Sequence, residues 1–252
     1  MNPNQNESDV SAALLRHAPM LPRDRVVPVC HEGKRYWVKF REERKTLRHR
    51  ILKGNALAAL AREKDLLLAF AKRGVSVPRI VAYSSECIIL TDHGPDLTMV
   101  LEETSCADAI LRRVGEALAE MHAVGVAHGR PCIRDICWDN NTATFLDLEA
   151  GARLDAGPLR QARDLLLLVH SLFSSKPVYH KHAPAILEGY IANDTKSVWP
   201  VAVKIARRSY LLELLAKPII WRQRQRGKTS SEFYAIPTTR RFIRTYDSKV
   251  PT

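Results

Sequence analysis

The stretch from residue 128 to residue 149 most constrains what this chain can fold into. It opens with the loop HGRPCIRD at 128–135 and closes with FLDLE at 145–149. The residues between them alternate like two short strands around an Asp-Asn-Asn turn. A loop that carries one carboxylate therefore leads into a hairpin that ends in another. This pattern predicts that Asp135 and Asp147 meet in one cleft.

The composition indicates a folded chain. It has 252 residues, of which 46% are apolar, enough for one large domain or for two small lobes. No apolar run approaches the roughly 20 residues that span a bilayer, and the polar start lacks a signal segment. We therefore expect a cytoplasmic protein. The five cysteines are odd in number and form no CxxC, which predicts reduced thiols and no zinc site.

The positive charge lies in the C-terminal quarter. From Lys196 onward there are 13 Lys and Arg against 3 Asp and Glu, a surplus of 10, so the first 195 residues carry only 2 of the net charge of +12. This part should contact an anionic partner, such as a phospholipid surface, a phosphorylated glycolipid or a nucleic acid. A solvated helix with a frayed tail is the alternative. The aromatic residues of the C-terminal quarter are too widely spaced for a motif that stacks on bases, so nucleic acid is not the expected partner.

The N-terminal third is predicted to be rich in strands. After a loose leader at 1–20, a hairpin is expected at 25–40, a helix at 55–73 and two short strands at 79–84 and 87–91. A basic connector at 41–53 joins the hairpin to the helix. The Asp-His-Gly-Pro break that begins at Asp92 is the best candidate for a lobe boundary. We therefore predict a small N-lobe at 21–93.

The remainder is predicted to be mainly helical. Outside the hairpin described above, helical periodicity is found at 97–103, 107–124, 157–173, 184–191 and 199–225. We therefore predict a larger helical C-lobe at 94–225, followed by a basic tail at 226–252. The fold class is α+β.

This order of elements, taken with the loop and hairpin, resembles a small bacterial kinase of the protein-kinase-like superfamily. The nearest groups are the lipopolysaccharide kinases and the RIO-like kinases, and the resemblance covers roughly residues 25–173. It implies a bilobal protein-kinase-like fold that uses ATP and Mg²⁺. It also implies transfer of phosphate to a hydroxyl, either on a lipopolysaccharide-core sugar or on a protein serine or threonine. The expected acceptor is thus an anionic glycolipid or a protein.

The resemblance places the cofactor site in the N-lobe. Lys39 matches the strand lysine that contacts the α- and β-phosphates, and Glu63, 24 residues later, matches its helix partner. Thr91 and Asp92 are assigned to the same site. From the residues alone, an edge-strand lysine that faces water and an ordinary helix-surface glutamate remain alternatives.

The loop can be matched in two registers. In one, His128 begins the motif, Arg130 stands at the catalytic aspartate position and Asp135 at the metal-binding position. In the other, the Arg-Asp pair at 134–135 begins it and Asn140 holds the metal. We favour the first, because Asp135 leaves 11 residues before Asp147, which is room for a strand, a turn and a strand. Asn140 lies within the turn.

The predicted catalytic residues are therefore His128, Arg130 and Asp135, and the predicted metal ligands are Asp135 and Asp147. Asp164 resembles the helix aspartate that anchors the loop. Loss of a general base costs about 10² to 10⁴ in rate, yet phosphoryl transfer depends mainly on positioning and charge, so activity can survive.

The alternative is a pseudokinase that binds a nucleotide, a partner or a membrane without turnover. Residues 23–36 contain no GxGxxG, which favours this alternative. In it, Arg130 props the loop against a buried acid. In either case, the basic C-terminal segment is expected to give peripheral contact with the anionic inner membrane face.

Overall fold

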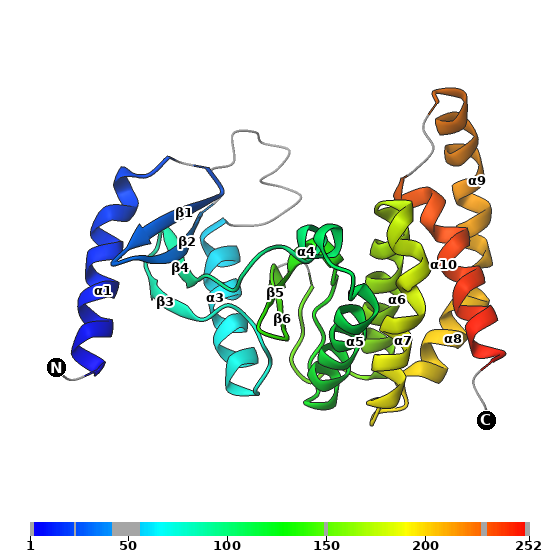
Figure 1. The fold of residues 1–252 in the computed structure, drawn as a ribbon, viewed down its shortest axis with the longest axis horizontal. Helices are drawn as coiled ribbons and strands as arrows, with labels where there is room; N and C mark the ends of the chain where they lie inside the picture. Colours follow the sequence, from blue (N-terminus) through cyan, green and yellow to red (C-terminus); the bar gives the residue numbers. More distant parts are fainter. Residues whose placement is uncertain (1–2, 23, 42–55, 149–150, 228–230, 250–252) are drawn as a thin grey trace. The chain divides into compact units, whose positions relative to one another are not determined.

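The computed structural model describes residues 3–22, 24–41, 56–148, 151–227 and 231–249 (Figure 1). Contacts divide the chain into two compact units. The first comprises Met1–Gly94 with Leu146–Glu149, and the second comprises Pro95–Phe145 with Ala150–Thr252. The predicted α+β class is confirmed, because the first unit contains a small antiparallel sheet and the second is mostly helical. Most of the predicted connector and Glu149 lie outside the described residues.

The sheet of the first unit has four antiparallel strands in the order β1-β2-β4-β3. Glu32 and Gly33 join β1 to β2 with φ angles of 49° and 73°. Positive φ at both central residues is what a two-residue type I′ hairpin requires. The β1–β2 turn is therefore tight. A glycine-rich flap would need a longer loop at this position. The strands are β1 (Val26–His31), β2 (Lys34–Phe40), β3 (Ile80–Tyr83) and β4 (Cys87–Thr91).

The N-terminal residues are not the loose leader that the sequence predicted. Pro3–His17 form helix α1, which continues into the short helix η1 (Ala18–Met20). Leu14 and Ala18 are 2% and 3% exposed, and they pack in one cluster with strand residues such as Val38. The helix exists because the sheet offers it an apolar face, a contact between residues far apart in the sequence.

The two faces of β2 have different chemistry. Tyr36, Val38 and Phe40 belong to the cluster beneath α1. Successive strand residues point to opposite faces, so Lys39 lies on the other one. That side belongs to helix α3 (Ala56–Lys72), whose Glu63 is the partner of Lys39.

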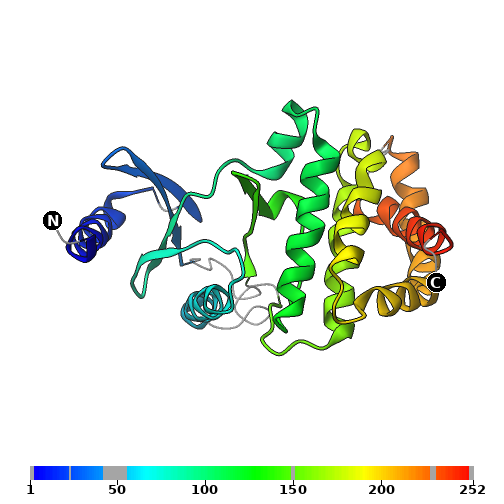
Figure 2. The same cartoon turned by 60° about the horizontal axis from the view of Figure 1, so that its bottom comes forward.

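The second unit is a set of helices with one hairpin, and its helices lie side by side in Figures 1 and 2. No described helix is both long enough and apolar enough to cross a membrane. The elements are α4 (Leu97–Glu103), α5 (Ala107–Ala123), η2 (Ile133–Asp135), β5 (Ile136–Asp139), β6 (Thr142–Phe145), α6 (Pro158–Ser174), η4 (Pro177–His182), α7 (Ala183–Ala192), α8 (Val198–Arg208), α9 (Tyr210–Gln225) and α10 (Glu232–Asp247).

The C-terminal part differs from the prediction in two ways. The single helix predicted at 199–225 is two helices, α8 and α9, which meet at Ser209. The predicted tail at 226–252 contains α10, which packs on α6 and α8 and buries Ala235, Thr239 and Ile243. The sequence did not predict this helix because its buried stripe has only one residue per turn and lies among many arginines and an internal proline, Pro237.

Two glycines bring α5 and α7 unusually close together. A Cβ on Gly115 would lie 2.1 Å from the carbonyl oxygen of Ile186, and one on Gly189 would lie 2.0 Å from that of Arg112. Neither position has room for a methyl group, because backbone atoms on the facing helix cannot move aside alone. The two helices therefore depend on both glycines for their separation.

We expect Gly115→Ala to lower the free energy of unfolding by about 3 kcal/mol, because it forces α5 and α7 apart. Chemical denaturation would measure this change. Gly157→Ala is the matched control: an added Cβ there meets nothing within 4 Å, so a loss below about 1 kcal/mol is expected from its weaker helix capping. Equal losses in the two variants would contradict the close-packing explanation.

Candidate functional site

A buried lysine lies between two carboxylates in the first unit. Lys39 Nζ is 2.5 Å from Glu63 Oε1 and 3.2 Å from Asp147 Oδ1. The side chains of Lys39 and Glu63 are only 11% and 5% exposed. Burial of a charge is costly unless it is paired, so the two carboxylates offset the cost of burying Lys39. The predicted Lys39–Glu63 pair is present; its role toward a nucleotide stays a prediction.

Asp147 follows strand β6 by one residue and adopts a left-handed backbone, with φ of 60°. Aspartate tolerates this conformation better than most residues, and such strain gathers at functional sites. Its Oδ1 faces Lys39 and Arg25, the latter at 3.4 Å. Its Oδ2 accepts no hydrogen bond from the part of the chain that the structure describes. The side chain is 33% exposed, which leaves this oxygen for a ligand. No sequence signal distinguished Arg25.

Asp92 and Thr91 have side-chain partners within the same unit. Asp92 accepts hydrogen bonds from Arg35, at 2.8 and 3.0 Å, and from Trp37 Nε1 at 2.7 Å. Burial raises the pKa of Asp92, but the hydrogen bonds from Arg35 and Trp37 outweigh it and hold the pKa below its ordinary value. The Thr91 hydroxyl lies 2.7 Å from His93 Nε2. These contacts tie β2 to the end of β4, and the assigned cofactor role of both residues stays a prediction.

In the second unit, helix α6 holds the predicted catalytic loop through three buried side chains. Both carboxylate oxygens of Asp164 accept from the Gly129 N–H, at 3.0 and 3.1 Å. Gln161 Nε2 donates to the backbone oxygens of His122 and Val126 at 2.8 and 3.4 Å. Ser171 Oγ accepts from the Ile133 N–H at 3.0 Å. The contact between Asp164 and Gly129 is the one expected of the loop anchor that the resemblance implied. Nothing in the sequence pointed to Gln161 or Ser171.

A buried cluster supports Asp164 from behind. His122 Nε2 lies 3.5 Å from Asp164 Oδ2, and His122 Nδ1 shares a hydrogen bond of 2.6 Å with the hydroxyl of Tyr190. Burial, together with the carboxylates of Asp194 and Asp164, raises the pKa of Tyr190 far above its ordinary value. The Tyr190 hydroxyl therefore stays protonated, and α5, α6 and α7 share one polar core.

The loop residues divide into buried and exposed ones. His128 is 1% exposed and its ring meets the ring of Phe145 edge-on, with 5.9 Å between centroids. We interpret it as a positioning residue. Arg130 is exposed, and its guanidinium has no ion pair with any described residue. The described residues thus offer no buried acid against which Arg130 props the loop. Asn140, with φ of 44°, lies in the β5–β6 turn, as expected.

Asp135 ends η2, where its N–H donates to the carbonyl oxygen of Cys132 at 2.9 Å. It belongs to the second unit, whereas Asp147 belongs to the first, so their convergence stays a prediction. Among the described residues, no three His, Cys, Asp or Glu side chains gather as a metal site. Mg²⁺ does not require such a group, because it keeps several waters and uses one or two carboxylates beside substrate phosphates.

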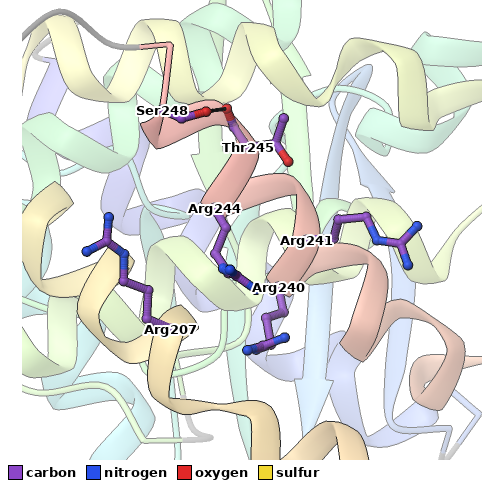
Figure 3. Close-up of a pocket in the computed structure, with 6 residues that line it drawn as sticks. All are labelled: Arg207, Arg240, Arg241, Arg244, Thr245 and Ser248. Carbon is purple, nitrogen blue, oxygen red and sulfur yellow. Dashed lines mark hydrogen bonds between the residues drawn. The ribbon is translucent and has the colours of Figure 1, made fainter.

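Four arginines of the C-terminal quarter line a hollow of about 610 Å³ (Figure 3). Arg207 pairs with Asp247 at 2.9 Å, and Arg240 pairs with Glu213 at 3.0 Å. The Nε of Arg240 is buried without a hydrogen-bond partner in the described chain. Guanidinium groups around one hollow suit an anion. The lining residues are Arg207, Arg240, Arg241, Arg244, Thr245 and Ser248.

Comparison with known proteins identifies the family. Residues 25–190, about two-thirds of the chain, match the lipopolysaccharide kinase (Kdo/WaaP) family. The chain belongs to this family. It is 28% identical over 203 residues to an uncharacterized protein of Haemophilus influenzae, covering 78% of this chain and 84% of that protein. The solved structure of WaaP in complex with acyl carrier protein is 19% identical, with a TM-score of 0.47, and the match covers 79% of this chain and 82% of that one.

We expect Asp164→Ala to lower the free energy of unfolding by about 3 kcal/mol, because it leaves the Gly129 N–H without its charged acceptor. Thermal and chemical denaturation would measure the loss. Asp139→Ala removes an exposed aspartate from the hairpin of the same unit and should change stability by less than about 0.5 kcal/mol. Similar losses in the two variants would show that Asp164 does not anchor the loop.

Proposed function

We propose that this lipopolysaccharide kinase family member is an ATP- and Mg²⁺-dependent phosphotransferase whose acceptor is a sugar hydroxyl of the lipopolysaccharide core. A serine or threonine hydroxyl of a protein is the alternative acceptor. The observation that carries the proposal is the cluster of Lys39, Glu63 and Asp147 in one unit. A kinase needs a strand lysine, its helix glutamate and a metal-binding aspartate in place together.

Lys39 supplies the positive charge for the nucleotide phosphates. Its ammonium group is a compact point charge on a rigid strand, and Glu63 keeps it oriented. Phosphate oxygens that approach Nζ would take the place of the Asp147 oxygen now 3.2 Å away. That exchange would leave Asp147 for the metal, in keeping with an Oδ2 that no described residue contacts by a hydrogen bond.

Bound Mg²⁺ supplies neutralisation of charge on the β- and γ-phosphates. Asp147 fits this ion because its carboxylate is partly exposed and has one oxygen that no described residue engages. Asp135 is the second proposed ligand, on the loop that α6 holds. The acidic pair would need no further protein ligand, since Mg²⁺ commonly takes its other ligands from substrate phosphates and water.

Arg130 distinguishes the proposed site from a kinase site that has an aspartate at this position. A guanidinium stays protonated, so Arg130 cannot accept the proton of the attacking hydroxyl. It is exposed and without an acidic partner in the described chain, so it can bind an anionic group by two parallel hydrogen bonds. We propose that it orients the transferred phosphate or a charged group of the acceptor. Catalysis then depends on positioning and electrostatic stabilisation.

The runner-up function is a pseudokinase that binds a nucleotide, a partner or a membrane. The two-residue turn at Glu32 and Gly33 favours it, since a turn this short does not form a glycine-rich flap over a nucleotide. The location that fits both functions is cytoplasmic, with peripheral contact at the inner membrane face. The basic C-terminal residues support this contact through their attraction to anionic lipid.

We expect saturating ATP–Mg²⁺ to stabilise the protein, by about 2.7 kcal/mol at 100 times its dissociation constant. Label from ATP should pass to lipopolysaccharide core extracts. Asp147→Asn and Asp135→Asn should each lower transfer at least about 100-fold, whereas Asp139→Asn, at an exposed hairpin position, should not. Stabilisation by ATP–Mg²⁺ with no transfer to sugar or protein would establish the pseudokinase. No nucleotide effect at all would contradict both functions.

We expect Arg130→Ala to lower the transfer rate about 10- to 1,000-fold, because it removes a charge that stabilises the transferred or acceptor group. Stabilisation by ATP–Mg²⁺ should stay unchanged if Arg130 orients the acceptor and should fall if Arg130 holds the transferred phosphate. Single-turnover transfer and a thermal-shift titration would measure the two effects. Arg134→Ala, at an exposed position in the same loop, is the control. Full activity of the Arg130 variant would remove Arg130 from the proposed mechanism.

A further inference from the structure

Helix α9 presents an apolar face that no other part of the described chain covers. Leu211, Leu214, Leu215 and Trp221 are 56%, 48%, 72% and 65% exposed. Their spacing, with Tyr210 one residue before them, places them on one side of an α-helix. In Figure 1, α9 (orange) extends past the ends of α6 and α7. Single exposed apolar residues are ordinary, but a continuous face of them marks an interaction site.

The opposite face of α9 holds the helix on the body. Glu213 accepts from Arg240 at 3.0 Å, and Gln223 accepts from the Ser231 hydroxyl at 2.6 Å. Between them Ala216 is 2% exposed. All these contacts belong to the face that meets α10 and its start. The outward leucines therefore add nothing to the packing of α9, and folding alone does not account for them.

Cations border the apolar face. Lys217, Arg222 and Arg226 are exposed, and none of them has an acidic partner within the described residues. Arg224 lies over the ring of Tyr234, 5.9 Å from its centroid. The one acid of α9, Glu213, is occupied by Arg240 on the inner face. An approaching surface therefore meets an apolar centre with positive charge beside it and no negative charge.

We propose that α9 docks on an anionic lipid bilayer and lies in its interfacial layer. The leucines enter the acyl boundary, the amphipathic rings of Tyr210 and Trp221 lie at the headgroup level, and the basic side chains meet lipid phosphates. The inference deepens the proposed function. It rests on that function in one respect, which is that a glycolipid acceptor would lie in the membrane on which α9 docks. It assigns the docking to this one helix.

A bilayer fits this face better than a protein does. Protein interfaces carry about one hydrogen bond per 100–200 Å², yet the outward side of α9 from Leu211 to Trp221 offers few polar groups: the indole N–H and, at its edge, the ammonium group of Lys217. A helix that lies in a bilayer interface needs only an apolar face that enters the lipid and basic side chains beside it. The 16 residues of α9 span about 24 Å, enough for several lipid headgroups. A second copy of the chain and an acidic protein are the competing occupants.

The test uses the full chain with phosphatidylcholine vesicles, with and without phosphatidylglycerol. The variant carries Leu211→Gln, Leu214→Gln and Leu215→Gln; the control carries Met99→Gln and Leu159→Gln, at apolar positions 58% and 66% exposed elsewhere in the second unit. In co-sedimentation, the wild type and the control should bind the anionic vesicles. The triple variant should bind at least about 100-fold more weakly. High salt should weaken wild-type binding without abolishing it, because the apolar part is not screened.

Other outcomes overturn the proposal. Equal vesicle binding by the triple variant would do so, as would binding that high salt abolishes entirely. A wild-type dimer that the triple variant dissociates, with no vesicle binding, would assign the face to a second copy. A wild-type monomer that binds no vesicles would also refute bilayer docking. The unfolding midpoint of the triple variant should match that of the wild type, because these leucines are exposed.

The kinase proposal and the docking proposal can fail separately. Transfer from ATP to a detergent-dispersed acceptor should be the same in the triple variant and the wild type, since α9 takes no part in the Lys39 cluster. A wild type that binds vesicles but transfers no phosphate would refute the kinase while docking stands. A wild type that transfers phosphate in detergent but ignores vesicles would refute the docking alone.

Discussion

The buried ion pair between Lys39 and Glu63 is the constraint on which the first unit depends. Its charges can stay buried only if they meet, since removal of one partner from such a pair costs about 3–5 kcal/mol. Strand β2 must therefore turn Lys39 away from the cluster beneath α1, and α3 must lie on that opposite side. Asp147 completes the arrangement from far along the chain with a left-handed backbone. One ammonium group thus joins a strand, a helix and the short segment of the first unit that contains Asp147.

In the second unit, different residues hold the loop at 128–135 in shape and face solvent from it. Gln161, Asp164 and Ser171 lie on the buried side of α6 and bind backbone groups of the loop and of the segment before it. Arg130 points to solvent and contributes nothing to that framework. An arginine can therefore stand at the position of a catalytic aspartate while the anchors keep the loop in shape. Its consequence falls on reactivity and acceptor binding, as the proposed mechanism requires.

The C-terminal helices show how packing determines which charges and which apolar groups stay exposed. Helix α10 uses Ala235, Thr239 and Ile243 to pack on the body, and its arginines face the hollow. It also ties down the inner face of α9, which leaves the leucines of that helix outward. The family match ends at residue 190, so these features lie beyond what membership of the family explains.

The hairpins, most of the helices and the α+β class were predictable from the sequence, because turn residues and apolar periodicity act locally; the motifs of the loop and hairpin carried the resemblance to the family. It also indicated the pairing of Lys39 with Glu63 through a family pattern. Tertiary contacts determine that Pro3–His17 and Glu232–Asp247 are packed helices, that Arg35 and Trp37 bind Asp92, and that Arg130 has no ion pair with any described residue. These facts depend on which distant residues come into contact. Burial and pairing are properties of such contacts, and a local pattern does not contain them.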